Sequence, residues 1–403
     1  MNVLLLEGIH PAAAERLAAA GCEARREAGS PEPEILAAAL AETTLLGIRS
    51  KTQVTEALLD QAPDLLALGA FCIGTNQIDL DACTRRGIVV FNAPFSNTRS
   101  VAELAIAEIV LLLRNLPDKL YAMHAGRWQK SATGSHEVRG KTLGIVGYGK
   151  IGMQLSVLAE ALGMRVLYFD LAERLAIGNA VRAASLGALL AQADVVTLHV
   201  DGRATNYGLM DAAAIARMKP GAILLNLSRG YVVDTDALSE AIAAGRIGGA
   251  ALDVYPEEPA SKQSAFATPL AQVANVILTP HIGGSTEEAQ LDIGQYVSGR
   301  LADYLANGGT IGSVNFPEIA APRPPGTCRI AHLHENMPGR LAAINQVLAE
   351  HGLNVAGQHL ATAATVGYVL TDVDGVPGDA VLVSLSAIPH SLRARLLAPS
   401  VQM

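Results

Sequence analysis

Short apolar runs alternate with helix-like stretches over the first ninety or so residues. NVLLLEG is followed by PAAAERLAAAG, TLLGIRS by VTEALLDQA and LLALGA by DLDACTRRG, and the series ends at IVVFNAP. The Val, Leu and Ile runs are too continuous to leave one face in water, which is typical of parallel strands covered by helices on both sides. We therefore predict an α/β lobe built on a doubly wound parallel sheet.

A second series of the same kind follows a helix that we predict over residues 100–114, with Ser100 as its N-cap. Its strand-like runs are TLGIVGYG, RVLYFD, DVVTLHV, GAILLNLSRG, GGAALDV and NVILTPH. A long helix is predicted from Ser285, and the Pro-rich stretch VNFPEIAAPRPPGT then interrupts the pattern. The sequence thus predicts a second Rossmann-like lobe with its own doubly wound parallel sheet.

The remaining residues, 326–403, predict a smaller module. Strand CRIAHLHE, helix PGRLAAINQVLAEHG, strands NVAGQHLA and VGYVLTDV, helix PGDAVLVSLSA and strand LRARLLA give the order βαββαβ, which is ferredoxin-like. Pro338 suits a first helical turn, and Asn336 either caps that helix or presents its amide to a ligand there. Taking alternate strand positions to face opposite sides, we expect no metal site at His332 and His334.

Composition narrows the class of protein. The 403 residues are 50% apolar with a net charge of −8, which favours a globular protein and argues against nucleic acid as a partner. No apolar run reaches the ~20 residues of a membrane helix, and we expect no export signal. The four cysteines lack C-x-x-C spacing, so we expect reduced thiols in a cytoplasmic protein without a bound metal.

The segment GIVGYGKIG predicts a phosphate-binding loop between a strand and a helix. Gly147, Gly149 and Gly152 form G-x-G-x-x-G, which permits a tight turn, close approach of a pyrophosphate and close helix packing. The next strand ends at Asp170, whose carboxylate can accept both ribose hydroxyls and would repel a 2′-phosphate. We therefore predict NAD rather than NADP as the cofactor.

Three polar residues follow later strands, at the edge where open α/β sheets bind ligands. Arg229 follows LLNLS, Glu258 lies in LDVYPEEP and His281 ends NVILTPH. Oxidation of a hydroxy acid needs a cation for the carboxylate, a base for the hydroxyl proton and a partner that orients the base, and these residue types suit the three tasks. Alternatively, His281 closes a loop and Glu258 is a solvated acid like its neighbour Glu257.

The motifs GYGKIG, NLSRGYVVDTDAL, ALDVYPEEP and TPHIGGST resemble the signature segments of the D-isomer-specific 2-hydroxyacid dehydrogenases. Residues 71–104 resemble one branch of that family, and the likeness covers nearly the whole chain. It implies NAD-dependent oxidation of 3-phospho-D-glycerate to 3-phosphohydroxypyruvate, the first step of L-serine synthesis. It also implies a substrate-binding domain formed by 1–97 and 284–317, an NAD-binding domain at 98–283 and a regulatory domain at 326–403.

The resemblance also implies roles for individual residues. Arg229 would bind the substrate carboxylate, His281 would be the acid/base and Glu258 would orient it. Asp201 stands where family members usually have proline, and an acid there could weaken NAD binding or contact the ribose. Lys130, with Trp128 nearby, would reach a partner subunit. The residues implied in cofactor binding are Gly147, Tyr148, Gly149, Lys150, Ile151, Gly152, Asp170, His199, Val200, Asp201 and Asp253, and those implied in substrate binding are Arg49, Ser50, Lys51, Asn97, Arg99 and Lys130.

The C-terminal module resembles the amino-acid-sensing ACT domain. The match implies that two such domains pair and bind L-serine between them, with His334, Asn336 and Asn354 as effector contacts, in a homotetramer inhibited by serine. The second helix of this module has weak helix propensity and could lean on a partner.

Two other functions stay open. The chain could be another D-2-hydroxyacid dehydrogenase, acting on 2-hydroxyglutarate, hydroxypyruvate or glyoxylate, because cations at 49, 51 and 99 would also suit a dicarboxylate. It could instead be a non-catalytic NAD-sensing interaction protein, like the C-terminal-binding corepressors. Replacing His281 separates an enzyme from a binding module.

Overall fold

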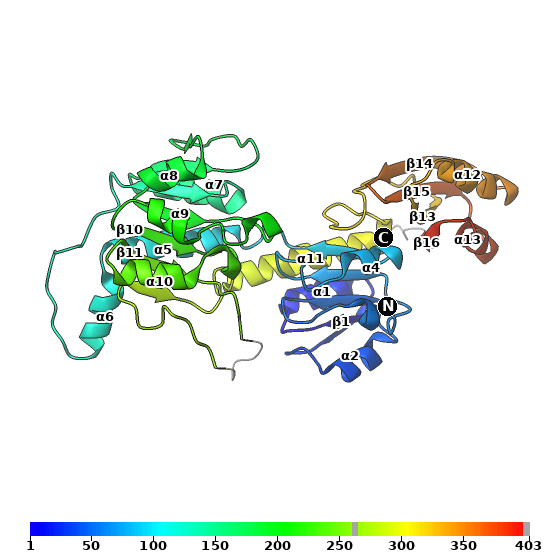
Figure 1. The fold of residues 1–403 in the computed structure, drawn as a ribbon. Coiled ribbons are helices and arrows are strands. Elements are labelled where there is room, and N and C mark those ends of the chain that lie inside the picture. Colours follow the sequence, from blue (N-terminus) through cyan, green and yellow to red (C-terminus); the bar gives the residue numbers. More distant parts are fainter. Residues whose placement is uncertain (260–264, 398–403) are drawn as a thin grey trace. The chain divides into compact units, whose positions relative to one another are not determined.

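The computed structural model describes residues 1–259 and 265–397. The chain divides into two compact units, one formed by Met1–Pro94 with Gln290–Met403 and the other by Phe95–Ala289. Figure 1 shows the elements of both, and each unit is described by itself. None of the helices in the described ranges is long and apolar enough to cross a membrane.

The first unit contains a five-stranded parallel sheet of order β2-β1-β3-β4-β5. Its central strands are almost fully buried, as their continuous apolar runs predict. The short helices start at side-chain caps such as Thr55 and Asp79, which accept hydrogen bonds from Leu58 N and Ala82 N. The elements are β1 (Asn2–Leu5), α1 (Pro11–Ala19), β2 (Glu23–Arg26), α2 (Pro33–Leu40), β3 (Leu45–Ile48), α3 (Glu56–Leu59), β4 (Ala67–Ala70), α4 (Leu80–Arg85) and β5 (Val89–Asn92).

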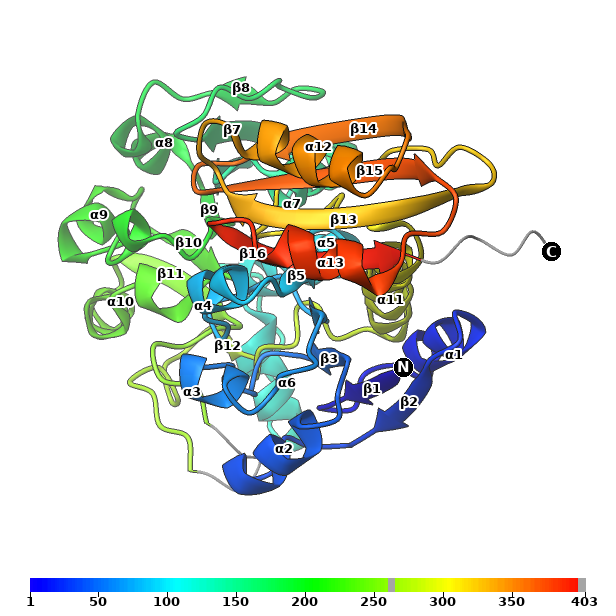
Figure 2. The same cartoon turned by 90° about the vertical axis from the view of Figure 1, so that its right-hand side faces the viewer.

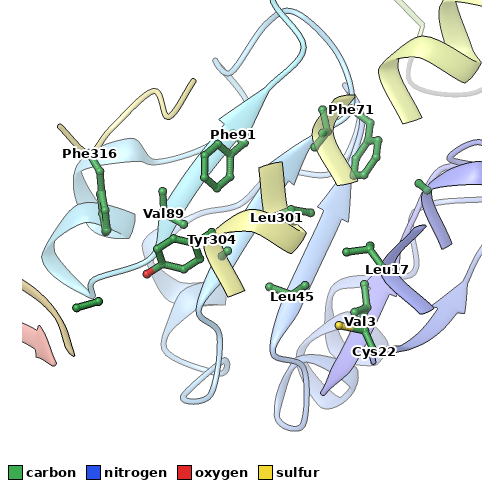
Figure 3. Packing of buried hydrophobic residues seen from close by; sticks show 14 of the residues in the cluster. Val3, Leu17, Cys22, Leu45, Phe71, Val89, Phe91, Leu301, Tyr304 and Phe316 are labelled. Atoms are coloured by element: carbon green, nitrogen blue, oxygen red, sulfur yellow. The ribbon is translucent and has the colours of Figure 1, made fainter. Parts of the chain in front are cut away.

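The predicted long helix is α11 (Glu287–Asn307), which packs Leu301 and Tyr304 against this sheet. Figure 3 shows these side chains beside Leu45 and Phe91. Strand β4 approaches the helix closely, since a Cβ at Gly69 would lie 2.7 Å from the Val297 side chain. The helix and the sheet therefore share one core.

The C-terminal module is an antiparallel sheet of order β14-β15-β13-β16 with two helices on one face (Figure 2). This order is ferredoxin-like and confirms the predicted βαββαβ arrangement. The other face, including Leu333 and Tyr368, joins the core around α11. The elements are β13 (Thr327–Glu335), α12 (Arg340–Glu350), β14 (Val355–Thr362), β15 (Val366–Asp374), α13 (Asp379–Ser386) and β16 (Ser391–Leu397).

Two expectations for this module were wrong. Helix α12 begins at Arg340 with Gly339 as N-cap at φ +84°, so Pro338 and Asn336 both lie outside it and Asn336 does not cap it. His332 and His334 lie on the same face of β13, with ring centroids 6.0 Å apart. Residues two apart on a strand share a face, so the argument that separated these rings had the wrong periodicity. No group of three metal-ligating side chains occurs among the described residues.

The second unit contains a seven-stranded sheet of order β12-β11-β10-β9-β6-β7-β8, parallel throughout. The six predicted strands are present, and the short β8 was missed. The elements are α5 (Thr98–Leu113), α6 (Leu116–His124), β6 (Thr142–Val146), α7 (Lys150–Ala161), β7 (Arg165–Phe169), β8 (Val181–Arg182), α8 (Leu186–Gln192), β9 (Val195–Leu198), η1 (Ala204–Asn206), α9 (Ala212–Arg217), β10 (Ala222–Asn226), η2 (Gly230–Val232), α10 (Thr235–Ala243), β11 (Ile247–Leu252) and β12 (Val276–Leu278).

The N-terminus of α5 differs from its prediction. The helix starts at Thr98 with Asn97 as N-cap, so Ser100 lies inside it rather than capping it. The hydroxyl of Ser100 instead lies 2.9 Å from that of Thr286. This places Ser100 in a side-chain contact within the second unit.

A buried ion pair in the first unit gives a stability prediction. The Arg329 guanidinium donates to both carboxylate oxygens of Asp372 at 2.7 and 2.8 Å, and also to the Ala321 carbonyl at 2.9 Å. Both side chains are fully buried. Because Arg329→Ala leaves Asp372 without its countercharge, we expect it to lower the free energy of unfolding by about 3–5 kcal/mol in urea denaturation.

The matched control is Arg25→Ala. Arg25 pairs with Glu27 at 2.7 Å, but both side chains are exposed, so its loss should change stability by about 0–1 kcal/mol. Equal effects of the two substitutions would contradict the importance of the buried pair.

Candidate functional site

The glycine-rich turn after β6 has the shape that a dinucleotide needs. Gly147 has φ +92°, and a Cβ there would lie 2.4 Å from the His199 carbonyl oxygen. A Cβ at Gly152 would lie 2.5 Å from the Gly147 carbonyl oxygen, whereas one at Gly149 would meet nothing within 4 Å. Two glycines thus allow close packing, and the third leaves open space over the backbone. Since Gly149 also begins α7 without a side-chain cap, the helix N–H groups can bind a pyrophosphate.

Asp170 lies at the end of β7, beside this turn. Its carboxylate accepts hydrogen bonds from Tyr148 N and Ala172 N, both at 2.9 Å, and lies 3.4 Å from Arg174 Nε. These contacts fix the carboxylate and leave it lone pairs for ribose hydroxyls. The position fits the adenosine ribose of NAD and disfavours a 2′-phosphate.

The other residues expected around the cofactor contribute in different ways. The Tyr148 side chain turns inward, where its hydroxyl lies 2.8 Å from Ser156 Oγ, so only its backbone faces the turn. Ile151 packs against the neighbouring core, and Lys150 lies over the ring of Phe95. Desolvation lowers the pKa of Lys150.

His199, Val200 and Asp201 follow β9. His199 Nε2 lies 2.9 Å from Thr197 Oγ1, and burial lowers the pKa of the imidazole to about 4, so the ring is neutral. Val200 is half-buried. Asp201 is exposed, accepts from Arg203 Nε at 2.7 Å and from Asn206 Nδ2 at 3.0 Å, and has its pKa lowered chiefly by Arg203. The unusual acid is therefore held in an ion pair.

Arg229 follows β10 in a turn with little steric freedom. A Cβ at Gly230 would lie 1.8 Å from the Tyr255 carbonyl carbon, so only glycine fits after the arginine. Asn226 donates to the Arg229 carbonyl at 2.9 Å, and Arg229 Nη1 donates to the Ser228 carbonyl at 2.7 Å. The turn thus fixes the backbone of Arg229 and leaves much of its half-buried guanidinium for a ligand.

Glu258 and His281 form a hydrogen-bonded pair, with Glu258 Oε2 2.8 Å from His281 Nδ1. The hydrogen bond to Glu258 outweighs burial and raises the pKa of His281, while Arg229 is near enough to lower it slightly. Burial raises the pKa of Glu258, but His281, the Tyr255 amide and Arg229 together lower it. The carboxylate therefore orients the ring, and His281 Nε2 remains to exchange a proton with a substrate.

Asp253, expected near the cofactor, holds the loop that carries His281. Its buried carboxylate accepts from Thr279 Oγ1 at 2.7 Å, Ile282 N at 2.8 Å and Gly283 N at 2.7 Å. His281 itself has φ +55°. These bonds stabilise a backbone conformation that a non-glycine residue rarely adopts.

The residues expected to bind substrate lie on one loop of the first unit, at the start of α5 and in the segment after α6. In the first unit, the Glu7 carboxylate accepts from the amides of Arg49, Lys51 and Thr52 at 3.2, 3.0 and 2.9 Å, which fixes the loop that also carries Ser50.

In the second unit, Arg99 pairs with Glu103 at 2.6 Å on the exposed side of α5. The Asn97 amide lies against Gly284, where a Cβ would be 2.2 Å from Asn97 Nδ2. Lys130 is exposed in the segment after α6, and Trp128 is 79% exposed. The segment that carries them therefore presents both a cation and a large aromatic ring to its surroundings.

The residues expected to bind an effector do not meet within one chain. His334 and Asn336 lie at the end of β13, where His334 Nδ1 is 2.7 Å from the Glu335 carbonyl oxygen and Asn336 Nδ2 donates to Ala363 O at 3.3 Å. Asn354 donates to Asp374 at 2.6 Å, and Asp374 pairs with Thr327 at the start of β13. The length of β13 separates these positions by roughly 20 Å or more at about 3.4 Å per residue.

Comparison with known proteins agrees with this geometry. A family model described as D-isomer specific 2-hydroxyacid dehydrogenase, NAD binding domain, matches residues 106–283, and an AHAS small subunit-like ACT domain matches residues 330–392. D-Lactate dehydrogenase from Aquifex aeolicus, solved with NAD and lactic acid, superposes with a TM-score of 0.67 at 27% identity over 79% of this chain and all of that one. Two relatives called D-3-phosphoglycerate dehydrogenase, from Haemophilus influenzae and Escherichia coli, are 50% and 49% identical, each over 98% of this chain and 97% of its own length.

The chain belongs to the D-isomer specific 2-hydroxyacid dehydrogenases, and it is an oxidoreductase with NAD as its cofactor. Its fold and its glycine-rich turn are those of that class. Within the class, the near full-length relatives place it in the D-3-phosphoglycerate dehydrogenase family, with an ACT domain at the C-terminal end of the described residues.

The Glu258–His281 pair gives a prediction about pH. Oxidation of a hydroxy acid needs a neutral His281, so the rate rises as pH passes the pKa of this histidine. Glu258→Gln removes the group that raises that pKa. We expect the midpoint of this rise to move to lower pH and kcat to fall by about 10²-fold, measured as NADH formation across a pH series.

Glu257→Gln is the matched control, because Glu257 is an exposed neighbour. It should leave both the midpoint and kcat unchanged. A midpoint that stays in place in Glu258→Gln would contradict the role of Glu258 in raising the pKa of His281.

Proposed function

We propose that this chain oxidises 3-phospho-D-glycerate to 3-phosphohydroxypyruvate with NAD, the step that opens L-serine synthesis. The observation that carries the proposal is the grouping of Arg229, Glu258 and His281 after strands of the NAD-binding sheet, where their charges act on one another. The names of the near full-length relatives support the choice of substrate.

Each group of this site has one task in the proposed reaction. The Arg229 guanidinium binds the substrate carboxylate through two parallel N–H donors. His281 Nε2 accepts the hydroxyl proton, while Glu258 keeps Nδ1 protonated and stabilises the positive ring. Bound NAD supplies the hydride acceptor. The turn from Gly147 to Gly152 and the Asp170 carboxylate would hold it.

The phosphate of the substrate needs further cations. Arg49 and Lys51 take part in none of the ion pairs found among residues 1–259 and 265–397. Their loop is fixed by Glu7, which supports them as phosphate ligands. Arg99 is the weaker candidate because Glu103 neutralises it.

We also infer that the functional protein is a homo-oligomer. Leu120, Tyr121 and Met123 on α6, and Trp128 after it, are exposed apolar side chains, and they would be covered by a second copy. In the ACT domain, His334 and Asn336 lie too far from Asn354 to share a small amino acid within one chain. A two-fold axis that reverses the sheets would bring them together and create a serine site from two chains.

Replacing His281 tests the enzymatic role. We expect His281→Asn to lower kcat by about 10³-fold, because no group remains to move the proton, while NADH binding measured by fluorescence stays unchanged. The assay follows NADH consumption with phosphohydroxypyruvate. A wild-type chain that binds NADH but turns over neither this substrate nor another 2-keto acid would contradict the proposal and favour a binding module.

Complementation tests the two-chain effector site. L-Serine should inhibit the wild type, and both Asn354→Ala and the double variant His334→Ala, Asn336→Ala should lose this inhibition while keeping turnover. Mixing the two variants after mild dissociation should restore inhibition, because each mixed pair contains one intact site. Failure of the mixture to recover, with the wild type still inhibited, would contradict a site built from two chains.

A further inference from the structure

Helix α5 carries an acid that the reaction described above does not use. Glu108 is 1% exposed, and neither of its buried carboxylate oxygens has a hydrogen-bond partner among the residues that the structure describes. Its neighbours on the same helix face are Ala105, Ile109 and Leu112, all part of the apolar core. An ionised carboxylate in such surroundings is strongly disfavoured, so the neutral acid is the stable form.

The charged neighbourhood of Glu108 comes from the end of β11. Helix α5 and β11 share one core, in which Ala105 and Ile109 lie with Ala251. A Cβ at Gly283 would lie 2.9 Å from Asp253 Oδ2 and 3.5 Å from the Val101 side chain of α5, and both Asp253 and Tyr255 interact electrostatically with Glu108. Asp253 holds Thr279, Ile282 and Gly283, and the Tyr255 amide donates to Glu258 at 3.3 Å. The buried face of α5 therefore packs against the end of β11, where Asp253 and Tyr255 support the Glu258–His281 pair.

Charged groups on the other elements around α5 are engaged elsewhere. Asp118 of α6 accepts from Asn275 N at 3.0 Å. On α7, Lys150 lies on Phe95 and Glu160 accepts from Asn179 N at 3.1 Å. Glu258 and His281 of the proposed site also titrate, so a test must separate their ionisation from that of Glu108.

We propose that Glu108 is a positioning residue that acts through Asp253, and that its ionisation weakens the hold of Asp253 on the loop carrying His281. Two like charges in a buried site repel strongly, and the repulsion is relieved by moving the Asp253 carboxylate. This movement removes acceptors from the amides of Ile282 and Gly283. The catalytic histidine then loses its fixed orientation although no group in contact with substrate has changed.

The direction of this effect with pH follows from the surroundings. Burial, with a smaller contribution from Asp253, raises the pKa of Glu108 to about 8. The acid is therefore neutral at pH 7 and ionises in the alkaline range. Activity in the oxidation direction should rise through the pKa of His281 and then fall by about tenfold per pH unit once Glu108 ionises.

Glu108→Gln tests this proposal, because the amide keeps the shape of the neutral acid and cannot ionise. We expect turnover with 3-phospho-D-glycerate and NAD to match the wild type at pH 7 within about twofold, and the alkaline fall to disappear. Glu108→Asp keeps an ionisable group and should retain an alkaline fall at a shifted pH. An unchanged alkaline fall in Glu108→Gln would overturn the proposal.

Two further variants serve as controls. Glu240→Gln alters an exposed acid on α10 of the same unit and should leave the whole profile unchanged. Glu108→Met is neutral and apolar, so it should fold even if the buried amide of Glu108→Gln is not tolerated, and it should also lack the alkaline fall. A Glu108→Met enzyme with the wild-type fall would overturn the proposal as well.

Stability supplies a readout that needs no substrate and is therefore independent of the proposed reaction. The folded chain holds a proton on Glu108 up to a pKa of about 8, whereas the unfolded chain loses it near the ordinary value of 4.5. The protonated Glu108 side chain therefore contributes to the free energy of unfolding. This contribution is fully present below the pKa that Glu108 has in the unfolded chain, and it is lost as the pH rises to 8. The Tm of Glu108→Met relative to wild type should therefore increase between those pH values and level off above them.

Infrared spectroscopy of the whole protein identifies the protonated form directly. A carboxylic acid C=O band present at pH 7 and absent in Glu108→Gln is expected. A flat Tm difference together with no such band would show that Glu108 is already ionised at pH 7 and would overturn the proposal, whatever substrate the enzyme prefers.

Discussion

The carboxylate of Asp253 accepts three hydrogen bonds from the loop around His281, and these bonds decide where the imidazole stands. His281 has a positive φ, which its β-carbon disfavours, so the loop needs outside support to keep this conformation. Glu258 then only has to set the rotation of a ring whose backbone is already placed. The proposed proton transfer thus depends on a residue that need not touch the substrate.

Two close approaches of the backbone connect this loop to the rest of the site. Gly230 lies against the carbonyl of Tyr255, which fixes the turn of Arg229 relative to the segment leading to Glu258. Gly147 lies against the carbonyl of His199, which fixes the phosphate-binding turn relative to the next strand. Because each contact leaves no room for a Cβ, neighbouring strand ends are held at set distances. The site is rigid where its strands meet and needs little support from side chains there.

The sequence predicts those features of the fold that depend on patterns running along the chain. Continuous apolar runs marked six of the seven strands of the second sheet, but β8 has only two residues, both exposed, and leaves no such pattern. Helix starts were less predictable, since Ser100 and Asn336 are good caps by type, yet Asn97 and Gly339 precede the helices. Which residue caps a helix depends on the path of the incoming chain, and composition does not record it. The motif residues around Arg229, Glu258 and His281 follow strands as the pattern predicted. The distance between Asn354 and His334, in contrast, could be known only from the strand register of the folded sheet.

Glu108 shows how a functional residue can be missed although the sequence pattern already indicates that it lies on the buried face of its helix. In the sequence it merely interrupts an apolar run, and an isolated acid in a helix is usually taken to face water. The buried positions of α5 include Val101, Ala105, Glu108 and Leu112, a spacing of four, three and four that keeps one face of a helix. Periodicity therefore places Glu108 on the buried face, where an acid is costly unless it stays protonated. The sequence pattern does not show which residues lie next to Glu108. Only the sheet brings the end of β11, with Asp253, against that face of α5. The proposed role of Glu108 depends on this neighbouring residue.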